Sequence, residues 1–138
     1  MKGKNLLVMM TLFFFGAAAL SFVVSQDQKK GAPWNVPAEY KAMKNPHAGQ
    51  ADLVPAGKML WAKHCKSCHG NLGLGDGPKA ASLQTHPGNF KEAAFQAQTD
   101  GLIYYQSFIG RDEMPNFEKK IPEAEDRWAI VNYIRTLK

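Results

Sequence analysis

Apolar residues recur at helical spacing in two stretches of the chain. The first stretch carries three residues at positions i, i+3 and i+4, which share one face of a helix: Gly57, Leu60 and Trp61. The last stretch repeats this spacing with four residues: Ile130, Tyr133, Ile134 and Leu137. Pro55 suits a first helical turn, and acidic residues precede the last stretch. The pattern therefore predicts helices over about 55–64 and 123–137.

Gly57 lies inside the first predicted helix, where glycine is an unfavourable residue. It costs about 0.5–1 kcal/mol relative to alanine, so its presence indicates a close contact with another backbone. The last helix is the candidate for that contact. We expect the two helices to cross, with Gly57 letting Tyr133 or Ile130 come close.

Short helices joined by loops are predicted between these two. Four glycines within residues 70–77 exclude regular structure there. Short helices are expected in three places: 79–83, 91–97 and 101–109. Thr99 or Asp100 can cap the third of them, and Gly110 ends it.

The composition predicts one globular domain with an appendage. The chain has 138 residues, of which 45% are hydrophobic and 21% charged, which is enough for a single core. Three parts are predicted: a signal peptide or membrane anchor (1–25), an extended arm or linker (26–52) and a domain (53–138). Prolines break the arm, yet Trp34 and Tyr40 indicate that it packs on the domain rather than being wholly disordered.

The N-terminal segment carries an export signal. Two lysines precede an uncharged run over residues 6–24, a length between that of a signal peptide and that of a spanning helix. Val23 and Ser25 are small enough to permit cleavage before Gln26, which favours a removed signal peptide over a retained anchor. Both interpretations place the domain in the periplasm, the second anchored to the inner membrane by residues 6–24.

The positive charge of the chain does not indicate nucleic-acid binding. The formal net charge is +5, and removal of the leader with its two lysines lowers it to +3. Three lysines lie near the motif described next: Lys63, Lys66 and Lys79. They are expected to form either a solvated face or a surface that attracts an acidic partner protein.

Cys65-Lys66-Ser67-Cys68-His69 is the motif around which the chain is organised. Two thiols three residues apart, followed at once by an imidazole, suit the covalent attachment of a haem and the ligation of its iron by His69. CxxC also occurs in zinc sites and thioredoxin-like redox sites. A zinc site needs four N or S ligands, and the chain offers two cysteines and four histidines. The motif predicts one covalent haem c.

The glycine-rich loop that follows is expected to fold back under the haem. A metal-bound histidine usually has a hydrogen-bond acceptor that fixes its ring and raises its basicity. Pro78 is the candidate acceptor for His69, because no helix needs its carbonyl. Phosphate binding by this loop is disfavoured, since neither GK[S/T] nor GxGxxG after a strand is present.

Met114 is the candidate for the second axial ligand. A thioether is a soft, neutral donor, and Pro115 forces Met114 into an extended backbone in a charged, turn-rich loop. A gap-filling methionine is the alternative interpretation. Three other residues compete for the role: Met59, His64 and His86, of which His86 is the strongest.

From Pro55 to Leu137 the chain resembles a class I c-type cytochrome of the small bacterial single-haem kind. The matching pieces come in the family's order: the helix 57–61, CKSCHG at 65–70, GLGDGP at 73–78, GRDEMP at 110–115 and DRWAIVNYIRTL at 126–137. The resemblance implies an all-α fold whose first and last helices cross around the haem. It also implies thioether bonds from Cys65 and Cys68, axial ligation by His69 and Met114, and an acceptor at Pro78.

The expected function is outer-sphere electron transfer rather than enzyme catalysis. With both axial positions filled, no substrate binds the iron. The expected partners are redox proteins of an exported respiratory or other redox chain. Two alternatives stay open: a haem-binding subunit anchored in a membrane respiratory complex, and a haem enzyme or gas-binding protein with an open sixth site.

Overall fold

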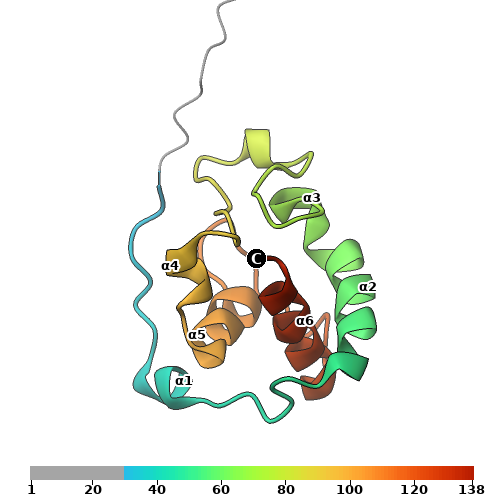
Figure 1. Cartoon of the computed structure of the whole chain (residues 1–138). Coiled ribbons are helices and arrows are strands. Elements are labelled where there is room, and N and C mark those ends of the chain that lie inside the picture. The colour runs from blue at the N-terminus through green and yellow to red at the C-terminus, as the bar shows by residue number, and fades with distance from the viewer. Residues whose placement is uncertain (1–29) are drawn as a thin grey trace, which may run out of the picture.

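The computed structural model describes residues 30–138, and the predicted leader lies outside these residues. Within the described range the chain is helical and forms no strand, which confirms the all-α prediction (Figure 1). The helices are α1 (Ala38–Ala42), α2 (Val54–His64), α3 (Lys66–His69), α4 (Ala93–Gln96), α5 (Asp100–Tyr104) and α6 (Ala124–Thr136). Short turns complete them: η1 (Ala51–Leu53), η2 (Ala80–Ser82) and the π-helical η3 (Tyr105–Ile109).

The helix boundaries follow the local signals in the sequence. Pro55 lies in the first turn of α2, and Glu125 and Asp126 lie in the first turn of α6. The side chain of Thr99, rather than that of Asp100, caps α5 by accepting from the backbone N–H of Leu102 at 3.3 Å. None of the helices in residues 30–138 is long and apolar enough to cross a membrane.

Helices α2 and α6 pack at Gly57, as predicted. A Cβ atom added to Gly57 would collide with the carbonyl oxygen of Ala129 and lie 3.0 Å from the Cβ of Tyr133. Only glycine permits this approach of the two backbones. Tyr133 is therefore the neighbour, while Ile130 lies fully buried in the core.

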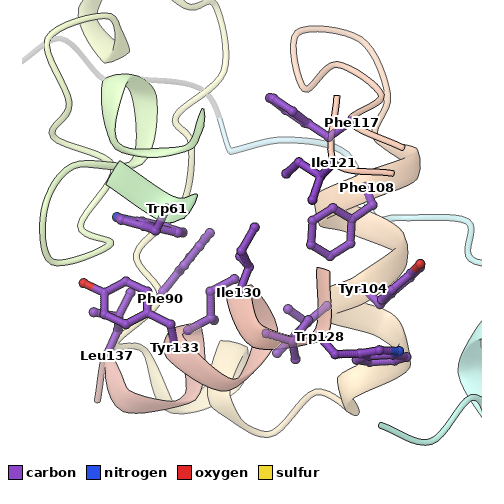
Figure 2. Packing of buried hydrophobic residues seen from close by; sticks show 13 residues of the cluster. Trp61, Phe90, Tyr104, Phe108, Phe117, Ile121, Trp128, Ile130, Tyr133 and Leu137 are labelled. Atoms are coloured by element: carbon purple, nitrogen blue, oxygen red, sulfur yellow. The ribbon is translucent and has the colours of Figure 1, made fainter. Parts of the chain in front are cut away.

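The hydrophobic core fills the space between α6 and the helices around it. Figure 2 shows Trp61, Phe90, Tyr133 and Leu137 gathered at one end of this cluster, and Phe108, Phe117 and Ile121 at the other, with Ile130 between them. The sequence positions that predicted the two helical stripes supply much of this core. Trp61 and Phe90, at the first of these ends, pack against His69 of the candidate site.

The described part of the arm, residues 30–52, lies against the domain. Its helix α1 packs on α5, because Gly101 leaves room for the backbone carbonyls of Tyr40 and Met43. Further along, the side-chain amide of Asn45 donates to Asp100 at 3.0 Å and to Asn132 at 2.8 Å. Figure 1 shows the arm running along one side of the domain to α1. The segment is a packed part of the molecule.

Candidate haem-binding site

The Cys65–His69 motif forms one helical turn at the end of α2. The backbone N–H groups of Cys68 and His69 both donate to the carbonyl of Cys65, at 3.2 and 3.0 Å. The spacing i, i+3 and i+4 puts the two thiols and the imidazole on the same side of that turn. Both thiols are free and partly exposed. The turn thus brings together the three groups that the sequence predicts to hold the haem.

His69 is a buried, neutral imidazole among aromatic rings. Its ring centroid lies 4.8 Å from that of Phe90 and 5.7 Å from that of Trp61. Burial lowers the pKa of His69 to about 4, and the carbonyl of Pro87 partly offsets this while His86 adds to it. At neutral pH the ring is therefore unprotonated and keeps a lone pair for a metal.

The Nδ1 atom of His69 is buried and makes no hydrogen bond. Among residues 30–138 it is the one buried side-chain nitrogen or oxygen without a hydrogen-bond partner. Buried polar groups are nearly always paired, so an exception points to a functional requirement. A buried imidazole with one free nitrogen, beside two free thiols, fits the attachment and ligation of a haem.

The burial of Cys65 argues against a reactive dithiol. Burial raises the pKa of this thiol to about 12, and the neighbouring Cys68 raises it further. Thioredoxin-like sites need the opposite shift, because the thiolate is their nucleophile. The pair is therefore poorly suited to thiol–disulfide exchange.

The glycine-rich loop folds back on the motif, and its predicted place under the haem stays a prediction. Backbone N–H groups of Gly75, Gly77 and Lys79 donate to the carbonyls of His69, Cys68 and Ser67, in that order, at 2.8–3.1 Å. A Cβ atom at Gly77 would lie 2.5 Å from the carbonyl oxygen of Ser67, so the loop fits this closely only with glycine there.

Pro78 lies in this loop, but no hydrogen bond connects its carbonyl to the ring of His69. The Nδ1 atom of His69 makes no hydrogen bond, and the carbonyl that acts on the ring is that of Pro87. The role of Pro78 as acceptor stays a prediction about the haem-bound protein.

Met114 lies in a tight turn that two backbone hydrogen bonds close. The N–H of each of Arg111 and Met114 donates to the carbonyl of the other, both at 2.8 Å. Asp112 adopts a positive φ of 47° within the turn. Met114 itself is half-buried and packs against the core cluster. The turn thus holds the thioether at the edge of the core.

The three competing ligands are placed less favourably. Met59 is 70% exposed, and the ring of His64 packs edge-on against Phe117. His86 packs against Gly75, whose N–H donates to the carbonyl of His69, so it belongs to the same side of the site as His69. Of the two methionines among the four candidates, Met114 packs against the core cluster and Met59 does not.

Two side chains that hold the Met114 turn were not predicted from the sequence. The carboxylate of Glu113 accepts from the backbone N–H of Gln84 at 3.0 Å and of Thr85 at 3.1 Å. The guanidinium of Arg111 donates to backbone carbonyls of the arm. Both contacts join segments far apart in the chain, and a single sequence carries no local signal for such pairs.

Comparison with known protein families gives a match to the model described as "Cytochrome c", over residues 54–138. The chain belongs to the cytochrome c family. Residues 54–138 of this cytochrome are thus a haem-binding electron-transfer domain, and the predicted resemblance is confirmed.

Two solved structures are similar to this cytochrome. One is the "KustC0563 c-type cytochrome", with 30% identity and a TM-score of 0.51, covering 59% of this chain and 96% of that one. The other belongs to the "reducing HAO-like protein complex Kustc0457/Kustc0458" of Kuenenia stuttgartiensis, with 27% identity and a TM-score of 0.55. That match covers 63% of this chain and 44% of the other, so the chain spans less than half of its length. No curated protein matches the sequence.

Proposed function

We propose that the protein is an exported electron carrier with one haem c. In this proposal Cys65 and Cys68 would hold the haem through thioether bonds, and His69 and Met114 would ligate its iron. The observation that carries it is the pairing of a buried, neutral His69 with a free Nδ1 and a half-buried Met114 at the edge of the same core. The proposed location is the periplasm, as the leader indicates.

The residues on the His69 side would attach the haem and orient the imidazole. The helical turn holds the two thiols at a fixed spacing, and the rings of Trp61 and Phe90 hold the imidazole among apolar neighbours. Trp61 also donates its indole N–H to the carbonyl of Gly70 at 3.0 Å, which fixes the chain directly after His69. These contacts support an imidazole that keeps one orientation while the iron is oxidised and reduced.

On the other side, Met114 would complete the ligand set of the iron. The haem, when bound, supplies a one-electron couple between ferrous and ferric iron. A thioether favours the ferrous form relative to a second imidazole, which raises the potential. The apolar surroundings of the core disfavour the additional charge of the ferric form. Together these features support electron transfer without a substrate on the metal.

A second candidate function is a haem-binding part of a larger assembly or enzyme. The observation that favours it is the similar structure from the HAO-like protein complex, where the matched region is less than half of the longer chain. In that case the partners are neighbouring redox proteins of the complex, and residues 6–24 are the proposed anchor in the inner membrane.

The spectrum of the purified ferric protein tests the ligand set. We expect a weak far-red charge-transfer band from the Met–iron bond, and its loss in Met114→Ala together with a lower potential and carbon monoxide binding by the ferrous form. His86→Ala is the matched control and should keep the band. A Met114→Ala protein with the parent's spectrum and potential would contradict the assignment. Release of the pigment by acidified acetone would contradict covalent attachment.

A further inference from the structure

The arm contacts the Met114 turn through the side chain of Arg111. The guanidinium of Arg111 lies 4.0 Å from the ring centroid of Trp34 and donates to the carbonyls of Ala32 and Pro33, the latter at 2.8 Å. Trp34 in turn packs edge-on against Tyr105 in η3, with ring centroids 6.3 Å apart. Three consecutive residues of the arm thus contact this guanidinium, and we call them the holder: Ala32, Pro33 and Trp34.

The backbone of Arg111 is at the same time half of the Met114 turn. Its N–H and carbonyl make the two 2.8 Å hydrogen bonds that close the turn. Arg111 thus joins the arm, through its side chain, to the turn that carries Met114, through its backbone. The family match begins at residue 54, which means that the holder lies outside the matched domain.

We propose that the arm positions the sulfur ligand, with Ala32–Trp34 holding Arg111 and Arg111 holding Met114. This inference rests on the proposed ligation of the iron by Met114. Arg111 and Trp34 are positioning residues, because they act on Met114 through the turn. Cation–π and charge-assisted contacts of this kind are strongest where a guanidinium is partly shielded from water, and the Arg111 side chain is only 29% exposed.

The consequence concerns how readily the thioether leaves the iron. An arm that holds the turn in one conformation disfavours the state in which Met114 has swung away. Loss of the holder should therefore increase the rate at which an added ligand replaces Met114. The overall fold should change little, because the residues of the holder do not belong to the core cluster.

The test mixes the ferric full-length holoprotein with imidazole and follows the loss of the far-red band. We expect Trp34→Ala and Arg111→Gln each to accelerate replacement about tenfold, which corresponds to about 1.4 kcal/mol. Trp34→Phe keeps an aromatic face and should restore most of the parent rate. The double variant Trp34→Ala/Arg111→Gln should match Arg111→Gln alone, because the Trp34 ring acts on the turn only through the guanidinium that this change removes.

Asn45→Ala is the matched control. It loosens the arm at its other attachment, to Asp100 and Asn132, without touching Arg111. We expect a replacement rate close to that of the parent. Equal acceleration by Asn45→Ala would show general loosening and overturn the inference, as would parent-like rates in both single variants. Additive acceleration in the double variant would also overturn it.

A second readout separates this inference from the ligand assignment. Absence of the far-red band from the parent protein would contradict Met114 as ligand. It would not decide whether the arm holds the turn, which needs a measurement independent of the iron. Hydrogen exchange of the Met114 N–H tests it, because this group donates to Arg111 whatever binds the iron. We expect faster exchange in Trp34→Ala than in Asn45→Ala. Equal exchange in the two variants would show that the arm does not hold the turn.

Discussion

The two sides of the site are built in different ways. The His69 side is continuous in sequence: helix α2, the thiol turn and the glycine loop follow one another and hydrogen-bond among themselves. It also rests on the crossing of α2 and α6, the most extensive contact between helices in the described residues. The Met114 side is a short turn held by contacts from distant segments, namely Gln84 and Thr85 on one side and the arm on the other.

This difference predicts that the stability of the domain and the ligation by Met114 can be changed separately. A change on the His69 side disturbs the core and should reduce the stability of the whole domain. A change on the Met114 side disturbs a surface turn and should alter how firmly the sulfur is held, with little effect on global unfolding. The predictions below test this separation, in order of decreasing effect on stability.

Gly57→Ala should cause the largest loss of stability. In an exposed helix this change stabilises, since alanine is favoured over glycine by about 0.8–1.0 kcal/mol. Here the new Cβ meets the carbonyl oxygen of Ala129, so we expect destabilisation by about 2–3 kcal/mol, at the upper end for overpacking. Urea unfolding of the holoprotein measures it. Met59→Ala, on the exposed face of the same helix, should leave the midpoint nearly unchanged. A stabilised Gly57→Ala protein would refute the crossing.

Trp61→Phe should have an intermediate effect. It keeps an aromatic ring beside His69 but removes the N–H that donates to Gly70, and a buried carbonyl left without a partner costs about 1–3 kcal/mol. Trp128→Phe is the control, because it removes a similar part of an indole from another part of the core. Thermal unfolding should show the larger loss for Trp61→Phe. We also expect an altered iron spectrum only in that variant, since Trp61 packs against His69.

The two sides also differ in how far the sequence predicts them. The two main helices follow from local spacing, and the glycine loop folds through hydrogen bonds to the residues directly before it. The contact of Gly57 with Ala129 joins distant segments, and it was predictable because glycine is unfavourable inside a helix unless another backbone comes close. The cap of α5 by Thr99 follows from local spacing as well. The supports of Met114 do not, since Glu113 pairs with residues 28 and 29 positions away and Arg111 with residues 78 and 79 away.

The acceptor of His69 shows a related limit. Pro78 was predicted because its carbonyl is free of helical bonding and because the resemblance implies it, and this role stays a prediction. The backbone of Pro87, from a second loop, raises the pKa of His69, and no local signal in the sequence indicated this neighbour. The position of a side chain in a packed core is set by all its neighbours, and a single sequence does not name them.

Glu113→Ala should have the smallest effect on stability and a clear effect on ligation. Both hydrogen bonds that it removes are at the surface, and their net contribution is about 0.5–1.5 kcal/mol each, mostly local to the turn. We expect the urea midpoint to shift less than in Trp61→Phe, while imidazole replaces Met114 several-fold faster. Glu113→Gln keeps an acceptor oxygen and should lie between the parent and the alanine variant. A loss of global stability as large as that of Trp61→Phe, with an unchanged replacement rate, would mean that the turn is part of the cooperative core and that the two sides are not separable.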